Sequence, residues 1–353
     1  MAADPLLSTL HAKYYADPSF YEVERQEIFN KEWQCVGFEY QLEAPGAYVK
    51  ESIAGTDVFV RRGTDGSLHA FHNSCPHRGG PIVLDDEGRA GNLVCRYHGW
   101  AFREDGALLS ARDFGADVPG EPCLRRARVD TWRGVVFVNL DLQAAPLLEW
   151  FGGWVTRMNE WKLEGAVFHS RHVHAMDCNW KTYMDNYLEG YHVPLVHPGL
   201  NQMTEGNKYR VWNHGDRRWN IHLTPHPGGV DIPGTFMCMW PNFAMDIYDE
   251  GWSTERWLPR GPHRTDLIRD YFFHPGEARA DAIVKESEQV AAEDAVMSEL
   301  VQRNLDAGWF EQGPLSPRHE NGLMDWHEIY REVITEGGPA KAVGPNPTRN
   351  PTS

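Results

Sequence analysis

The sequence predicts an α+β fold in which a small all-β domain precedes a larger domain of helices and strands. From about residue 46 to 142, short β-branched runs such as AYVKE, DVFVRR and GVVFVNL alternate with turn signals. After Leu142 the pattern lengthens, with strand-like runs at 236–248 and 267–273 and a helical period over 276–307. The 353 residues, 41% hydrophobic and 24% charged, are enough for two domains with cores of their own.

Two further segments flank these domains. Residues 19–34 place Tyr21, Ile28, Phe29 and Trp33 near one side of a helix, after a serine that can cap it. The sequence therefore predicts four regions: an N-terminal helical segment (1–40) packed on the second domain, a β domain (41–145), the α+β domain (146–340) and a loose Pro-rich polar tail (341–353).

The charge balance argues against two classes of partner. The chain has 34 Lys and Arg against 50 Asp and Glu, a net charge of -16 that repels phosphate backbones and anionic lipids. We therefore expect no nucleic-acid and no membrane partner. The first residues lack a basic and apolar leader pattern, and the six cysteines are too scattered for a disulfide scaffold. Both features favour a cytoplasmic protein in which some cysteines bind metal.

Two Cys-His pairs stand out within the β domain. CPHRGG contains Cys75 and His77, and CRYHGW contains Cys95 and His98 after seventeen intervening residues. Four good metal ligands from two loops predict one site. A structural zinc site is the simplest alternative, but zinc sites commonly pair like ligands within a loop, whereas each loop here gives one thiolate and one imidazole. Mixed pairs suit a cluster whose two irons differ, one bound by both Cys and the other by both His.

These loops resemble those of the Rieske non-haem iron oxygenases, whose pattern C-x-H-R-G…C-x-Y-H-G-W they match at nearly every position. The resemblance implies a Rieske [2Fe–2S] cluster bound by Cys75, His77, Cys95 and His98. Respiratory-type Rieske proteins carry a disulfide across the two loops, and Gly80 and Tyr97 occupy those places in this chain.

A second metal site is predicted within DNYLEGYHVPLVHP, residues 185–198. His192 and His197 would lie about 140° apart on a regular helix, so both could not face one metal. Pro194 lies between them and should end or distort the helix, which lets His197 turn toward the site. A di-iron carboxylate site would need Glu-x-x-His twice, and only His192 has a Glu three residues before it.

The resemblance implies that His192 and His197 are the histidines of a two-His-one-carboxylate site for mononuclear Fe(II). It places the carboxylate at Asp294, with the adjacent Glu293 left open as the alternative. Glu189 lies one helical turn before His192 and can accept its ring N–H. By resemblance, Glu189 would bridge this iron to the cluster of a neighbouring subunit.

The family also implies a helix-grip-like antiparallel sheet, a homotrimer and a terminal oxygenase that uses O2 and a small-molecule substrate. Electrons would come from a separate flavin and iron–sulfur reductase, with or without a ferredoxin, because no nucleotide or plant-type cluster motif is present. Glu at position 189 resembles the branch that hydroxylates or N-demethylates quaternary ammonium compounds. The alternatives are an aromatic ring-hydroxylating oxygenase and an electron-transfer protein with an inactive second site.

Overall fold

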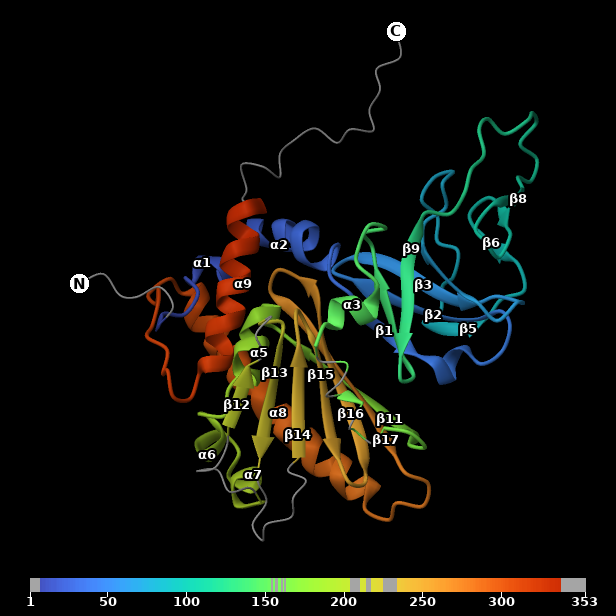
Figure 1. Cartoon of the computed structure of the whole chain (residues 1–353). Helices are drawn as coiled ribbons and strands as arrows, with labels where there is room; N and C mark the ends of the chain where they lie inside the picture. Colours follow the sequence, from blue (N-terminus) through green and yellow to red (C-terminus); the bar gives the residue numbers. More distant parts are fainter. Residues whose placement is uncertain are drawn as a thin grey trace.

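Two seven-stranded antiparallel sheets form the framework of the computed structural model (Figure 1). The structure describes residues 7–153, 155, 158–159, 161, 163–203, 210–213, 217–224 and 234–337. The tail predicted at 341–353 lies outside these residues. The α+β class expected from the sequence is confirmed, with a strand-rich first half and a helix-and-sheet second half.

The first sheet has the strand order β1-β10-β9-β4-β3-β2-β5, and a small three-stranded sheet, β6-β7-β8, stands beside it. The β-branched runs of the sequence become its strands, as the alternation with turn residues predicts. Their bounds are β1 Gln34–Phe38, β2 Ala47–Ile53, β3 Thr56–Arg62, β4 Leu68–His72, β5 Glu87–Arg89, β6 Leu93–Val94, β7 Ala101–Phe102, β8 Leu108–Ser110, β9 Arg126–Trp132 and β10 Val135–Asn139.

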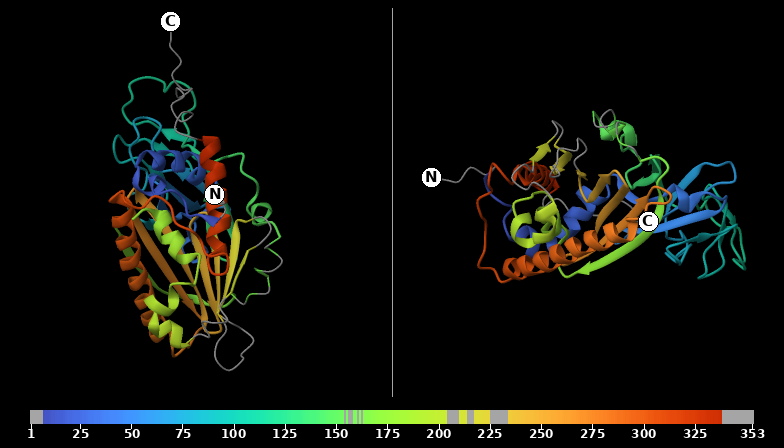
Figure 2. Two further views of the ribbon diagram at one scale, coloured as in Figure 1. Left: turned by 90° about the vertical axis from the view of Figure 1, so that its left-hand side faces the viewer. Right: turned by 90° about the horizontal axis from the view of Figure 1, so that it is seen from below.

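The second sheet has the order β11-β17-β16-β15-β14-β13-β12, and the long helix α8 lies along one of its faces (Figure 2). Its strands are β11 Val167–Met176, β12 Arg210–Asn213, β13 Trp219–Thr224, β14 Gly234–Met239, β15 Phe243–Tyr248, β16 Gly251–Gly261 and β17 Arg264–Phe273. The helices of this half are α3 Leu147–Phe151, α5 Trp180–Tyr187, α6 Val193–Val196, α7 Pro198–Met203, α8 Ala280–Asp306 and α9 Asn321–Gly337.

The N-terminal segment differs from its prediction. It contains the short helices α1 (Lys13–Ala16) and α2 (Ser19–Glu24), a π-helical turn at Arg25–Phe29 and, after β1, a 3₁₀ turn at Glu39–Leu42. Residues 34–38, expected in a helical segment, instead form strand β1, which pairs with β10. The physical reason is burial on both sides, because Val36 belongs to one hydrophobic core while Cys35 and Phe38 belong to another.

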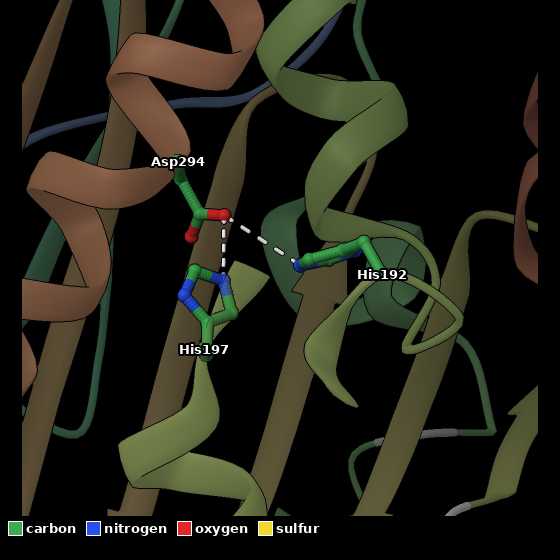
Figure 3. A group of neighbouring side chains, drawn as sticks. All are labelled: His192, His197 and Asp294. Atoms are coloured by element: carbon green, nitrogen blue, oxygen red, sulfur yellow. Dashed lines mark hydrogen bonds and ion pairs between the residues drawn. The ribbon is translucent and has the colours of Figure 1, made fainter. Parts of the chain in front are cut away.

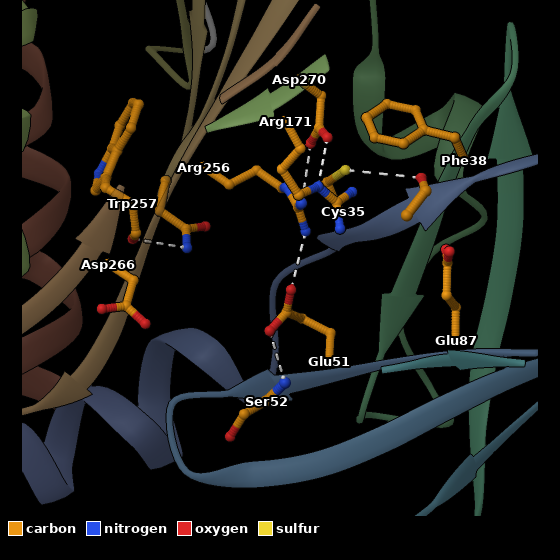
Figure 4. Close-up of polar contacts among 12 residues, drawn as sticks. Cys35, Phe38, Glu51, Ser52, Glu87, Arg171, Arg256, Trp257, Asp266 and Asp270 are labelled. Atoms are coloured by element: carbon orange, nitrogen blue, oxygen red, sulfur yellow. Dashed lines mark hydrogen bonds and ion pairs between the residues drawn. The ribbon is translucent and has the colours of Figure 1, made fainter. Parts of the chain in front are cut away.

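A buried arginine joins the two sheets (Figure 4). Arg256 on β16 is 1% exposed and reaches Glu51 of β2 and Asp270 of β17, each at 3.0 Å. Arg171 of β11 adds a second bond to Asp270 at 2.6 Å. Since a buried charge is tolerated only with partners, these contacts hold the two domains in one relative position.

A second buried ion pair fixes helix α5. Lys181 lies 2.5 Å from Glu24 of α2, and neither side chain is exposed. Trp180 and Tyr330 of α9 also donate to the Glu24 carboxylate. Three segments that are far apart in the sequence therefore meet at one carboxylate, which sets the start of the helix leading to the predicted iron ligands.

Removing the cation of this pair should destabilise the protein strongly. In Lys181→Met, Glu24 stays buried without its partner, which costs about 3–5 kcal/mol in such pairs. Urea unfolding followed by tryptophan fluorescence measures the change. Lys31→Met is the matched control, because Lys31 pairs with Glu27 on the surface of the same segment and should matter little. An unchanged free energy of unfolding in Lys181→Met would contradict the view that the Lys181–Glu24 ion pair stabilises the protein.

Candidate functional site

The two Cys-His loops have matching backbone geometry. In the first loop the Cys75 N–H donates to Gly80 O and the Gly79 N–H donates to Cys75 O, both at 2.8 Å. In the second, the Cys95 N–H donates to Trp100 O and the Gly99 N–H to Cys95 O, both at 2.9 Å. Gly79 and Gly99 have φ of 70° and 75°, a conformation that favours glycine. The glycines after each His therefore shape two equivalent loops.

The side chains of these loops converge as ligands of one site would. Cys75 and Cys95 are buried, and the rings of His77 and His98 lie edge to face with centroids 4.7 Å apart. His77 also stacks on Trp100 of the other loop. Its Nδ1 is buried and has no hydrogen-bond partner among the described residues, as expected of an atom reserved for metal. The donor set of two thiols and two imidazoles fits a Rieske cluster.

Burial raises the pKa of the Cys75 thiol, and the neighbouring Cys95 raises it further. Two adjacent thiolates would be unfavourable in this environment without a compensating positive charge. Metal binding supplies that charge and displaces the thiol protons. The pair is therefore suited to a metal cluster rather than to a free reactive cysteine.

The places of the respiratory-type disulfide are also close in space. A Cβ on Gly80 would lie 2.9 Å from both the Sγ of Cys95 and the Cβ of Tyr97. Gly80 thus allows the two loops to approach, and a Cβ at this position would require Cys95, Tyr97 or the backbone of the loop to shift.

The predicted iron ligands come from the two ends of α6 and from α8, and they meet (Figure 3). His192 precedes α6, His197 follows it, and Asp294 lies in the middle of α8. Ligand atoms of the three residues all lie within 4.8 Å of one another. The Nε2 atoms of His197 and His192 are 2.8 and 3.5 Å from Asp294 Oδ1, so both rings direct the same nitrogen toward this carboxylate.

The helix that leads to the two histidines ends earlier than predicted, before both of them. Helix α5 ends at Tyr187, five residues before His192, and α6 begins anew at Val193. Pro194 lies in the first turn of α6, where its missing N–H costs no hydrogen bond. The proline therefore starts a helix rather than distorting one, and the two histidines flank α6 instead of sharing a kinked helix.

Each imidazole has a second carboxylate on its outer nitrogen. His192 Nδ1 is 2.6 Å from Glu189 Oε1, and His197 Nδ1 is 2.7 Å from Glu293 Oε2. Such outer partners fix the ring orientation and the tautomer of a metal-binding His. The sequence left open whether Asp294 or Glu293 is the carboxylate of the iron site. The geometry favours Asp294, because it faces the Nε2 atoms of both histidines, while Glu293 lies on the outer side of His197.

Burial disfavours charge on His197, but its contacts with Asp294 and Glu293 outweigh this effect and raise its pKa. A bound metal would take the place of that proton, since imidazole ligates through an unprotonated nitrogen. The three inner groups therefore fit a two-His-one-carboxylate site, which leaves positions open for oxygen.

Besides the triad and Glu189, the pocket contains residues that the sequence did not place there. It is lined by Asn186 and Tyr187 of α5, Glu189, Val193 and Leu200, His222 of β13, Phe236 of β14 and Val290 of α8, together with the triad. Asn186 donates to Asp294 Oδ1 at 2.7 Å. Burial lowers the pKa of His222 to about 3, so its ring is neutral. Only the strand register, which pairs His222 with Phe236, brings these two together.

Comparison with known proteins establishes the family. The model of the Rieske [2Fe-2S] domain matches residues 32–122, and that of the ring hydroxylating alpha subunit (catalytic domain) matches residues 155–336, just over half of the chain. The chain belongs to the Rieske oxygenase alpha subunits. The carnitine monooxygenase oxygenase subunit of Escherichia coli (strain K12) is 34% identical over 358 residues, covering 93% of this chain and 94% of that protein.

Other relatives of this Rieske oxygenase agree. The chloroplastic choline monooxygenase of Arabidopsis thaliana is 29% identical over 338 residues, covering 87% of this chain and 78% of that protein. The quaternary ammonium Rieske monooxygenase CntA in complex with L-carnitine matches with a TM-score of 0.82 and 26% identity, over 92% of this chain and 95% of that one. Naphthalene 1,2-dioxygenase from Rhodococcus sp. (TM-score 0.77, 17% identity, 94% and 95% coverage) shares the fold alone.

The resemblance seen in the sequence is therefore confirmed at the level of family, fold and cofactors. The protein is the terminal component of a Rieske oxygenase system, with a [2Fe–2S] cluster and a mononuclear iron. Such oxygenases take electrons from a separate reductase. The zinc and electron-transfer alternatives fall away, and the aromatic alternative gains no support beyond the shared fold. Within the described residues, no helix is long and apolar enough to cross a membrane.

Gly80→Ala should reduce the cluster content, because the added methyl group would lie 2.9 Å from Cys95 Sγ. Visible absorption and the ratio of iron to sulfide in the purified protein measure the loss. Gly91→Ala is the control in the same domain, since nothing lies within 4 Å of the Cβ it would add. A Gly80→Ala protein with a full, spectrally unchanged cluster would contradict this geometry.

Proposed function

We propose that this oxygenase hydroxylates or oxidatively N-demethylates a small quaternary ammonium compound. The observation that carries the proposal is near full-length similarity to a carnitine monooxygenase oxygenase subunit and to choline monooxygenases. The pocket supports it, because Tyr187, His222 and Phe236 line the space beside the triad. Aromatic faces attract a trimethylammonium group through cation–π interactions.

The proposal assigns a role to each metal ligand. Cys75, His77, Cys95 and His98 would hold the cluster, which supplies electrons one at a time. His192, His197 and Asp294 would hold the mononuclear iron, which supplies the open coordination positions where O2 is activated. Asn186 and Glu293 then orient Asp294 and His197, and Glu189 orients His192.

The proposed assembly is a head-to-tail homotrimer in which Glu189 links the iron of one subunit to the cluster of the next. The cluster loops, which flank β6, and helix α6 lie on opposite sides of the molecule, which favours electron transfer between subunits rather than within one (Figure 1). Both ends expose large apolar side chains, Tyr97 (55%) beside the cluster and Leu195 (89%) and Tyr191 (58%) beside the iron site. Exposed apolar residues of this kind are typical of interaction surfaces.

The remaining parts of the proposal concern the electron source and the compartment. The electrons would come from a flavin and iron–sulfur reductase, alone or with a ferredoxin. All six cysteines are free of disulfides, which agrees with a reducing, cytoplasmic environment.

A substrate screen tests the proposal. With a surrogate reductase and products identified by mass, choline, L-carnitine or γ-butyrobetaine should be oxidised. The neutral carbon isostere of the best substrate should bind about 2–30-fold more weakly, the range expected from a cation–π contribution. Oxidation of simple aromatic acids without any turnover of quaternary amines would refute it.

The bridging role of Glu189 can be separated from simple orientation by comparison with Glu293. Each carboxylate contacts the outer nitrogen of one iron-site His, so Glu189→Gln and Glu293→Gln should both weaken iron binding, by about 10–100-fold at most. If Glu189 also carries electrons between subunits, its variant should lose steady-state turnover even when iron is fully restored. Single-turnover and steady-state rates of iron-replete proteins distinguish these outcomes. If the two iron-replete variants keep equal steady-state turnover, Glu189 only orients His192 and does not carry electrons between subunits.

A further inference from the structure

Behind the pocket, the catalytic sheet carries a row of buried polar residues beneath α5 and α8. Phe236, which lines the pocket, pairs across the strands with Asp246 of β15, and Asp246 pairs with Ser253 of β16. Glu255 lies two residues beyond Ser253 and pairs with Arg269 of β17. Because alternate residues of a strand share a face, these side chains all point to the side that holds the triad.

Two of these carboxylates share one nitrogen of Arg269. Its NH2 group is 2.9 Å from Glu255 Oε1 and 3.7 Å from Asp246 Oδ2. The NH1 group is committed elsewhere, to Ser287 O and to Glu288 of α8 at 3.2 Å. Asp246, Glu255 and Arg269 are only 3 to 4% exposed. One cation therefore faces three carboxylates, two of them deeply buried.

Two tyrosines connect this pair to the pocket side. The Tyr187 hydroxyl donates to Asp246 Oδ1 and the Tyr183 hydroxyl donates to Glu255 Oε2, each at 3.0 Å. Both tyrosines lie on α5, and Tyr187 itself lines the pocket. A hydrogen-bonded link thus runs from the pocket wall to Asp246.

The charge balance of this group favours a retained proton. A second buried negative charge beside one shared arginine is costly, and the group can avoid that cost by binding a proton. Burial raises the pKa of Glu255 to about 7, against the opposing effect of Arg269, and burial also raises the pKa of Asp246. Two interacting carboxyls titrate as a unit, so the proton belongs to the pair.

We propose that Asp246 and Glu255 hold one proton between them at neutral pH and that Tyr187 passes this proton to the pocket when oxygen is reduced there. The proposal requires O2 reduction in this pocket, and it holds whichever substrate is oxidised.

The step balances with the known reaction class. Insertion of one atom of O2 into a C–H bond consumes two electrons and two protons and releases water. The reductase supplies the electrons, the carboxyl pair supplies one proton, and solvent water supplies the other. The Tyr187 O–H proton moves into the pocket, the carboxyl proton moves to the Tyr187 oxygen, and the pair becomes a dicarboxylate. The pair then regains a proton from solvent before the next cycle. In the resting hydrogen bond the Tyr187 O–H donates to Asp246 Oδ1. For the transfer the roles reverse, because the Tyr187 O–H turns toward the pocket and the protonated Asp246 carboxyl donates to the Tyr187 oxygen.

Other charged and titratable groups lie around the pair and around its neighbours Arg269 and Glu288 on each packed element. They are Tyr183 and Tyr187 of α5, His172 and His174 of β11, Cys238 of β14, Tyr248 of β15, Arg269 and Tyr271 of β17, and Glu288 and Asp294 of α8. Glu288 is the closest competitor for Arg269, but His174 lies 2.7 Å from it and Tyr271 donates to it at 2.8 Å. These partners hold the pKa of Glu288 at about 2, so it remains ionised.

Infrared spectroscopy of the purified protein, without substrate or reductase, tests the shared proton. Wild type should show the C=O stretch of a protonated carboxyl group that fades as the pH rises through about 7. The band should be absent from Asp246→Asn and from Glu255→Gln, because the remaining carboxyl then has Arg269 to itself. It should persist in the control Glu288→Gln, which removes a carboxylate from the same arginine. The proposal would be overturned if wild type showed no such band, or if the band remained in Asp246→Asn and Glu255→Gln.

The delivery step is tested by the fraction of O2 that ends as product rather than as hydrogen peroxide. Tyr187→Phe keeps the ring and should keep the infrared band, yet it should lower product formation by on the order of 100-fold, a common size for lost proton transfer. Asp246→Asn should do the same, while Glu288→Gln should stay near wild type. Iron and cluster contents equal to wild type exclude misfolding. Full coupling of oxygen use to product in Tyr187→Phe would overturn the relay.

Discussion

The buried contact between Lys181 and Glu24 is the constraint on which the iron site depends. It fixes the first turn of α5 against α2 and α9, and the last turn of the same helix carries Asn186 and Tyr187 into the pocket. In the last turn of α5, Asp185 accepts hydrogen bonds from Tyr15 of α1 and His327 of α9. Contacts from the N-terminal and C-terminal segments therefore stabilise α5, because an isolated helix of only eight residues would be barely stable in water.

A site is easier to predict from the sequence when its residues are close together in the chain. The proposed cluster ligands come from two short loops of one domain, so their spacing predicts one metal site, and the resemblance to the Rieske oxygenases names the cluster. The proposed iron ligands are less local, because His192 and His197 are close in the sequence but Asp294, placed by the same resemblance, comes from α8, nearly 100 residues later. The choice between Glu293 and Asp294 needed the structure, since neighbouring helical residues point about 100° apart and only one direction meets the Nε2 atoms.

Two other features could not be predicted, for a different physical reason. Strand β1 is buried on both faces, so it lacks the alternating pattern by which strands with one solvent-exposed face are recognised. The carboxylates Asp246 and Glu255 look like ordinary acidic residues within a chain of 50 such residues. Only the register of β14 to β17 brings them to one face beside a single arginine. Side-chain environment, rather than residue type, decides their chemistry.

The two proposed metal sites differ in their surroundings, and the difference suits electron transfer at the cluster and oxygen chemistry at the iron. The cluster loops are closed by backbone hydrogen bonds, and exposed residues such as Tyr97 surround them, so electrons can enter and leave at a surface. The iron site lies between α5, α8 and the sheet, where carboxylates occupy both sides of its imidazoles. Oxygen reduction needs protons as well as electrons, and a group in the pocket wall can supply a proton at a defined position. The buried carboxyl pair behind the pocket, joined to it through Tyr187, is placed to meet part of that demand.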